Sequence, residues 1–467
     1  MNLNEISENG RTALMTACAN GNFSLTKMLL ESGADPNIMG DKRNTPLMLA
    51  SYFGHLKIVK ILLESTADIQ ATDCNGCTAL CCASQEGHLD IVKFLVEKSM
   101  TNVNHQNYNG SSSLMKAAEN GHIDVCKYLI NIGANIELRN VFGGRALSAA
   151  LCQSQVEIAT LLLTNNCAIN FTSGNNNMTP LLLAIANELP IIVRLLIEYK
   201  ANVDVFDIKG DTPLINASIN GNIEIVQFLL ENKANIHIQN TKGHTALHVA
   251  ALKGFYLIVK ELIKSEANVN ILDSLGNTPL LLSSQNGYFE LAQILIDAGT
   301  DVNVKNGIGV TALIRSAYNN HSKLTMLLIQ SGADVNIRTM GKQAPLHLAA
   351  EKGYLNIVKI LVENKANLEI RNGREWTPLM LASYSNKVSV LKYLIDKGSE
   401  INAIEHIGDT ALILAAQQGS YQSALELLRS GANKEIKNYN DGTAHSKALS
   451  NKHNLSLIHI SEPTRPY

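Results

Sequence analysis

Four cysteines in one short segment are the residues best placed to do chemistry. Cys74 and Cys77 are separated by two residues, and Cys81 and Cys82 follow. Thiolates bind zinc and take part in redox reactions, but a structural zinc site needs four ligands, of which His105 would be one. Three interpretations stay open: a metal site, a reversible thiol pair of Cys74 and Cys77, or ordinary use of small residues. We favour the last.

The histidines recur at a regular spacing that argues against a shared metal or a catalytic group. His55, His88 and His122 are 33 and 34 residues apart, and His321 and His453 continue the series. No phosphate loop, dinucleotide fingerprint, zinc-protease motif or nucleophile elbow occurs. Acidic residues and histidines are not grouped as a catalytic pair requires. We therefore expect no enzyme activity, no bound metal and no cofactor.

The same spacing marks an internal repeat, which is carried by a Thr-Pro-Leu or Thr-Ala-Leu element. Successive elements are 33 residues apart, except for two steps of 34 whose extra residues fall near Met100 and in residues 175–177. Both places are expected to be loops, where insertions cost little. Ser112, Arg145 and Ala344 replace the threonine in three further units. The threonines are Thr12, Thr45, Thr78, Thr179, Thr212, Thr245, Thr278, Thr311, Thr377 and Thr410.

Each unit reads as two short helices followed by a turn. In the second unit, Thr45 is expected to cap the first helix and Pro46 to occupy its first position. Gly54 would end that helix in a left-handed conformation, and an apolar stripe over residues 58–63 predicts the second helix. Asp-x-x-Gly at residues 73–76 is typical of a tight turn. The terminating glycine is replaced by Ser154 and Glu188 in two units, where we expect local strain of ~1 kcal/mol.

The pattern resembles the ankyrin repeat. Residues 243–251 read GHTALHVAA and residues 332–336 read GADVN, close to the family consensus, and the resemblance covers residues 1–454. It implies an all-α repeat solenoid of stacked antiparallel helix pairs with β-turn hairpin loops. We expect about thirteen repeats in residues 1–442 and an incomplete fourteenth in residues 443–454.

Residues 455–467 do not fit the repeat. They resemble a translated sequencing adapter, and we interpret them as an artefactual tail rather than as part of the fold. The alternative is a genuine disordered tail.

Composition and charge argue against nucleic acid and membranes as partners. The formal net charge is −2 and basic residues are spread among acids, so we expect no nucleic-acid binding. No apolar run approaches the ~18–20 residues of a membrane span, so no membrane insertion is expected. The eight cysteines read mostly as free thiols, which favours a cytoplasmic location, with the nucleus also open. We expect a monomeric array.

The resemblance implies that partners bind the concave face formed by hairpin tips and first helices. Aromatic residues and arginine are the commonest hot spots of interfaces. Trp376, the only tryptophan, stands where packing is not expected to require it. We predict a partner-binding footprint on units ten to twelve, with two further candidates in the second unit; the alternative is that scattered surface aromatics have no role. The candidates are Tyr52, Phe53, Arg315, Tyr318, Arg374, Trp376 and Tyr384.

Two asparagines are candidates for hydroxylation, a modification found in this family on an Asn with a Leu eight residues earlier. Asn303 follows Leu295, and Asn336 follows Leu328, at that distance. The alternative is that these asparagines only bond the hairpin backbone.

The predicted function is that of a scaffold or adaptor that binds proteins. Two alternatives are the substrate-recognition arm of a larger enzyme, such as a kinase or ubiquitin ligase, and the cytoplasmic arm of an ion channel. Both would need sequence beyond residue 454, and nothing within residues 1–454 favours either.

Overall fold

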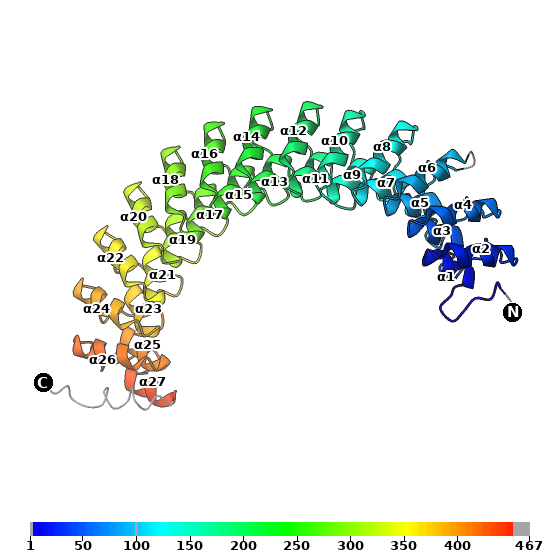
Figure 1. Ribbon diagram of the computed structural model, residues 1–467. Helices are drawn as coiled ribbons and strands as arrows, with labels where there is room; N and C mark the ends of the chain where they lie inside the picture. Colours follow the sequence, from blue (N-terminus) through cyan, green and yellow to red (C-terminus); the bar gives the residue numbers. More distant parts are fainter. Residues whose placement is uncertain (1–2, 99–100, 452–467) are drawn as a thin grey trace. The chain divides into compact units, whose positions relative to one another are not determined.

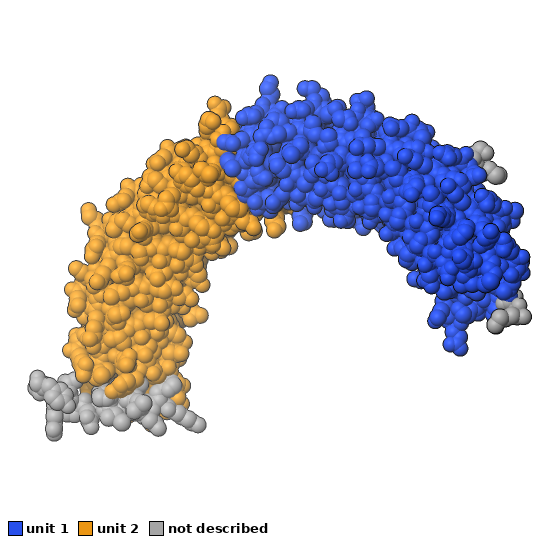
Figure 2. Space-filling model, in the orientation of Figure 1, with its two compact units in different colours: residues 1–240 blue, residues 241–467 orange. Residues whose placement is uncertain are grey.

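The structure, a computed structural model, describes residues 3–98 and 101–451. These residues form 27 helices and no strand, with three isolated β-bridges in loops. The predicted all-α repeat fold is therefore confirmed. The chain divides into two compact units, residues 1–240 and 241–467 (Figure 2). The predicted tail at residues 455–467 and the insertion near Met100 lie outside the described residues.

Unit 1 contains seven pairs of helices, a short first helix and a nine-residue second helix in each pair. In Figure 1 the odd-numbered helices of this unit form one row and the even-numbered helices a second row. The first helices are α1 (Ala13–Ala19), α3 (Pro46–Tyr52), α5 (Ala79–Gln85), α7 (Ser113–Glu119), α9 (Ala146–Cys152), α11 (Pro180–Ala186) and α13 (Pro213–Asn220). The second helices are α2 (Phe23–Glu31), α4 (Leu56–Glu64), α6 (Leu89–Glu97), α8 (Ile123–Asn131), α10 (Val156–Thr164), α12 (Pro190–Glu198) and α14 (Ile223–Glu231).

Unit 2 repeats this arrangement with six pairs and one further first helix. Its first helices are α15 (Ala246–Lys253), α17 (Pro279–Asn286), α19 (Ala312–Tyr318), α21 (Pro345–Lys352), α23 (Pro378–Tyr384), α25 (Ala411–Gln418) and α27 (Ala444–Ser450). Its second helices are α16 (Tyr256–Lys264), α18 (Phe289–Asp297), α20 (Ser322–Gln330), α22 (Leu355–Glu363), α24 (Val388–Asp396) and α26 (Tyr421–Arg429).

The ends of the first helices behave as the repeat predicts. Thr45 accepts a hydrogen bond from the Met48 backbone N–H, and Pro46 occupies the first helical turn. The residue that ends the first helix has positive φ even where glycine is absent, at Ser154 (56°) and Glu188 (54°). The assignment of these slots is therefore confirmed, and the strain expected at these two positions stays a prediction.

In both compact units the core lies between the first and the second helices of the repeats. In the second repeat, Leu47 of α3 and Val59 and Leu62 of α4 are fully buried. The opposite face of α4 is exposed, because only one stripe of a second helix meets its neighbours. Since no single helix pair covers its own apolar face, each pair is stabilised by the adjacent pairs within its unit.

Most hairpin tips are ordered by one Asp or Asn placed five residues before the helix cap. In the third repeat, Asp73 Oδ1 accepts hydrogen bonds from the backbone N–H groups of Asn75 (2.8 Å) and Cys77 (2.7 Å). Neighbouring tips also bond to each other through the backbone, as when Cys74 N donates to Lys42 O at 2.9 Å. The tips and first helices therefore form one continuous surface in each unit, which we call the tip face.

Candidate functional site

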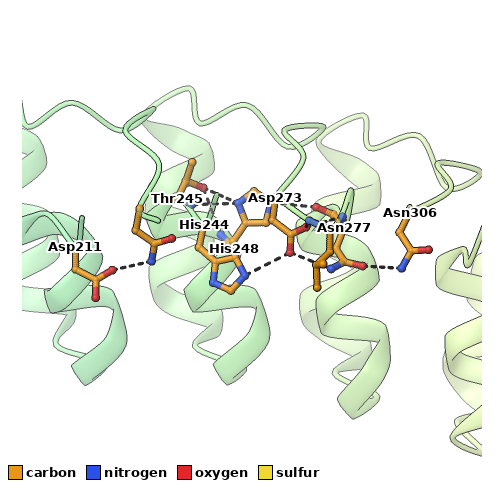
Figure 3. Close-up of polar contacts among 9 residues, drawn as sticks. Asp211, His244, Thr245, His248, Asp273, Asn277 and Asn306 are labelled. Atoms are coloured by element: carbon orange, nitrogen blue, oxygen red, sulfur yellow. Dashed lines mark hydrogen bonds and ion pairs between the residues drawn. The ribbon is translucent and has the colours of Figure 1, made fainter. Parts of the chain in front are cut away.

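Two positions of each repeat organise the tip face. The anchor position lies five residues before the helix cap and is Asp or Asn in most repeats, but Thr339 before α21 and Glu405 before α25. The pre-cap position directly precedes the cap. In unit 2, the Asn306 anchor donates through Nδ2 to the pre-cap Asn277 Oδ1 of the preceding repeat at 2.9 Å (Figure 3). The Asp273 anchor places Oδ2 3.3 Å from the Nε2 of His244, the preceding pre-cap residue. Side chains of adjacent repeats thus form a polar ladder.

The buried histidine of the first helix supports this ladder. His248 Nδ1 accepts from the Thr245 backbone N–H at 3.2 Å, and its Nε2 donates to the Asn277 carbonyl at 3.2 Å (Figure 3). Burial lowers the pKa of His248 to about 4, so the ring is neutral near pH 7. Burial opposes the charge of Asp273, but hydrogen bonds, chiefly from Asn277, lower the pKa of this carboxyl. His248 and Asp273 therefore hold hairpins together, as their positions in the repeat predict.

The hydrogen bond from an anchor to the preceding pre-cap residue, which we call a rung of the ladder, recurs elsewhere in each unit. In unit 1, Asn240 donates to the pre-cap Asp211 at 2.7 Å. In unit 2, Asn438 donates to the pre-cap Asp409 at 2.7 Å. A satisfied ladder leaves few polar groups with which a partner could bond.

In unit 2 the ladder is interrupted at α19, α21 and α23. The pre-cap residues there are Val310, Gln343 and Trp376. Val310 has no polar side chain, and Gln343 Oε1 is buried without a hydrogen-bond partner. The backbone bonds between tips persist, since Met340 N still donates to Ile308 O at 3.1 Å. Only the side-chain rungs are lost. We call α15 and α17 with their tips the ladder region, and α19, α21 and α23 with theirs the interrupted region.

A cavity of about 210 Å³ opens in the interrupted region, between α19 and α21. Its lining includes Arg315 and Tyr318, which lie one turn apart on α19. Tyr318 is 42% exposed, and the Lys352 ammonium lies 5.1 Å from the centre of its ring. The structure therefore brings together two of the residues predicted as partner-binding.

The other three residues of the predicted footprint form a second cluster at α23. The rings of Trp376 and Tyr384 have centroids 5.1 Å apart, and the Arg374 guanidinium lies 5.6 Å from the Trp376 ring. Trp376 is only 8% exposed. The expectation that packing does not require this tryptophan is therefore wrong: its ring is buried against Tyr384, and its role in binding stays a prediction. Arg374 and Tyr384 offer the more accessible side chains of the cluster.

The tips of the interrupted region also carry unusual backbone. Lys342 and Glu375 have φ values of 57° and 58° at a position that glycine fills in most repeats. A side chain in this left-handed conformation costs about 1 kcal/mol. The two side chains form an ion pair with Nζ and Oε1 3.8 Å apart. Charged side chains therefore occupy these tips although glycine would relieve the strain.

Tyr52 and Phe53, the predicted candidates in unit 1, line a separate cavity of about 410 Å³ on the tip face of α3 and α5. Their rings meet edge to face with centroids 5.1 Å apart. The charge of Glu86 is the main cause of a raised pKa at Tyr52. Cys74, Cys77 and Cys82 line the same cavity.

The cysteine cluster is arranged differently from the Cys74–Cys77 thiol pair, which was one of the three interpretations of the sequence. Cys77 is buried rather than exposed at the tip, and its sulfur accepts from Asn107 Nδ2 at 3.4 Å. A hydrogen bond from Cys81 lowers the pKa of the Cys77 thiol to about 7 and raises that of Cys81. Cys77 and Cys81 therefore influence each other's pKa, whereas Cys74 stays exposed.

The metal interpretation of this cluster finds no support in the described part of the chain. His105 Nε2 lies 2.8 Å from the Gly76 carbonyl, which fixes the ring on the backbone. No three His, Cys, Asp or Glu side chains among residues 3–98 and 101–451 are arranged to hold a metal ion.

Asn303 and Asn336 both join consecutive hairpins. Asn303 Nδ2 donates to Gly332 O at 3.0 Å and its Oδ1 accepts from Asp334 N at 2.9 Å. Asn336 makes the corresponding bonds to Lys365 O and Asn367 N. Their role in bonding the hairpin backbone is therefore present in the structure, and hydroxylation stays a prediction.

Sequence reasoning missed several residues of the tip face. Gln343 and Leu348 complete the cavity at Arg315, yet neither is aromatic or charged, which were the signals used. A cavity of about 460 Å³ at α7, α9 and α11 was also missed; Lys116 and Ser148 are among its lining residues. Three consecutive pre-cap residues other than Asn, Asp or His mark the interrupted region in the sequence, although unit 1 also departs from these types, as at Gly144 and Met178.

Paired helices, capped hairpins and bonded tips define a helical repeat protein. A family model of ankyrin repeats in three copies matches residues 1–73, 67–140, 146–240, 215–306, 301–372 and 364–438. The chain belongs to the ankyrin repeat family, whose repeats are generally protein-protein interaction modules. The comparison with curated proteins returned no match. In the described residues no helix is long and apolar enough to cross a membrane.

Proposed function

We propose that this chain is a scaffold or adaptor that binds a protein partner on the tip face of the interrupted region. The observation that carries the proposal is the break in the polar ladder. Where the ladder stops, a cavity opens beside Tyr318 and an aromatic pair forms at Trp376 and Tyr384. An exposed tyrosine and a half-buried arginine beside a cavity, such as Tyr318 and Arg315, are of the residue types most often found as interface hot spots.

The proposal concerns the surface and not what is attached to it. A recognition arm of a larger enzyme, or the cytoplasmic arm of a channel, would use the same tip face. No feature of the described residues favours either alternative over an adaptor.

The test compares three forms of the full chain as bait in an extract of the source cells. The forms are the wild type, a Tyr318→Ala/Tyr384→Ala variant and a Tyr256→Ala control. Tyr256 lies on α16, away from the tip face, and is 40% exposed against 42% for Tyr318. Affinities for each recovered protein are then measured by calorimetry.

The double variant should weaken binding at least tenfold, because hot-spot truncations each cost roughly 2 kcal/mol or more. The control should bind as the wild type does. If the double variant kept full affinity for every recovered protein, the interrupted region would not be the docking surface.

A further inference from the structure

Two buried polar atoms in the interrupted region have no hydrogen-bond partner among the described residues. They are Arg315 Nε and Gln343 Oε1. Both side chains line the cavity between α19 and α21. Buried donors and acceptors in folded proteins are nearly always bonded, so a pair left open in one cavity indicates a missing ligand group.

The rest of the cavity is apolar. Val310 and Ile314 are 8% and 2% exposed and pack with Ile337, and the partly buried Leu348 packs against this group. The volume of about 210 Å³ suits one side chain rather than a small molecule of drug size. An occupant must therefore combine a short apolar stem with a polar end.

The charge of the cavity indicates which polar group the occupant carries at its end. Among its lining residues Arg315 is a cation and none is acidic, and the Lys352 ammonium lies over the ring of Tyr318 at the rim. A carboxylate would accept a charge-assisted bond from Arg315 Nε, which is stronger than a bond between neutral groups. The Gln343 amide presents an N–H donor to the same carboxylate when it rotates by 180° about its last bond.

From these contacts we infer that the cavity is a subsite for a glutamate side chain in an extended segment of the partner. The two methylenes of glutamate lie against Ile314 and Leu348, and its carboxylate lies between Arg315 and Gln343. Aspartate lacks one methylene, and glutamine would satisfy the two open atoms without a charge-assisted bond. The inference rests on the proposed function, and it names the chemistry that the docking surface recognises.

The probe is a displayed library of random twelve-residue peptides, selected on the wild-type full chain. Peptides whose binding falls with Tyr318→Ala/Tyr384→Ala are kept, since these occupy the tip face. The expected result is a shared glutamate. For one such peptide, Glu→Gln, Glu→Asp and Glu→Ala versions are measured against the wild type, Arg315→Leu and the control Lys323→Leu, whose lysine is exposed on α20.

Glu→Gln should weaken binding at least tenfold on the wild type and on Lys323→Leu, but less than twofold on Arg315→Leu. This coupling separates a direct contact from a general effect of charge. Equal losses on all three proteins, or selected peptides with an apolar or glutamine anchor, would overturn the glutamate subsite. Melting curves confirm the fold of each variant, and Arg315→Gln replaces Arg315→Leu if the latter unfolds.

The outcomes also separate this inference from the proposed function. If no selected peptide depends on Tyr318 and Tyr384, both the docking surface and the subsite are wrong. If peptides bind the tip face without a glutamate, the docking surface stands and only the subsite is wrong.

Discussion

The ladder region and the interrupted region of unit 2 share a backbone and differ in their pre-cap residues. In both, tips bond to tips through the main chain. His244 and Asn277 join the ladder, whereas Val310 adds no polar group and Gln343 leaves one open. One region therefore uses its side chains to hold repeats together, and the other leaves them available at a cavity. Natural proteins often give up stability at binding sites in this way.

The largest effect should come from Trp376→Ala. The ring is buried against Tyr384, and truncating a buried tryptophan costs roughly 3–5 kcal/mol. Tyr384→Ala should cost less, because this side chain is more exposed. Hydrogen exchange of the α21 and α23 amides measures the local free energy of unfolding, which suits an array that need not unfold in one step. Equal costs for the two variants would show that Trp376 is not part of the packing.

Lowering the pH should reduce the stability of both regions by a similar amount. Burial lowers the pKa of His248 in the ladder region and of His347 in the interrupted region to about 4, below the ~6.5 of the unfolded chain. In this window the unfolded state binds more protons, so stability is complete above pH ~6.5 and falls as the pH drops toward 4. The loss should be on the order of 3 kcal/mol per histidine.

Besides burial, one hydrogen bond of each ring depends on the neutral form. His347 Nδ1 accepts from the Ala344 backbone N–H at 3.0 Å, as His248 does from Thr245, and a proton on Nδ1 would end that bond. Hydrogen exchange at pH 7 and pH 4.5 on His248→Gln and His347→Gln should show a reduced pH dependence in the repeat that is changed. A wild-type slope retained in either variant would contradict the assignment.

The sequence predicted the fold more fully than the site. Caps such as Thr45 and terminators such as Gly54 act within their own repeat, so spacing alone locates them. Arg315 and Tyr318 were found together because residues three apart on one helix share a face.

The parts of the site that could not be predicted depend on contacts that the sequence does not display. The burial of Trp376 depends on a ring eight residues later. Whether Gln343 Oε1 finds a hydrogen-bond partner depends on side chains of the adjacent repeats. The interaction of Cys77 with Cys81 depends on the backbone conformation at the helix cap.

Asn277→Leu should weaken the ladder region. This change leaves the buried Asn306 Nδ2 without its acceptor and removes one of the donors to Asp273 Oδ2, which keeps His244. The cost should be about 2 kcal/mol, since an unsatisfied buried group costs ~1–3 kcal/mol. Hydrogen exchange of the α17 and α19 amides measures it. An unchanged free energy of unfolding would mean that the ladder contributes nothing.

Gln343→Leu also places a leucine at the pre-cap position, but in the interrupted region. Its effect on the free energy of unfolding should have the opposite sign. Gln343 Oε1 is buried with no partner, whereas leucine places only apolar atoms beside Ile314 and Leu348. Replacing an unsatisfied group by an apolar one of similar size should stabilise α21 by up to about 1 kcal/mol. The Gln343 backbone N–H still donates to Thr339 Oγ1, so the hairpin keeps its bond. If both leucine variants lowered the free energy of unfolding equally, the two regions would not differ in the way their side chains indicate. A gain at Gln343 beside a loss at Asn277 would show that the Gln343 amide is a cost to folding, as expected of a group whose N–H, after rotation of the amide, bonds to a carboxylate of the partner.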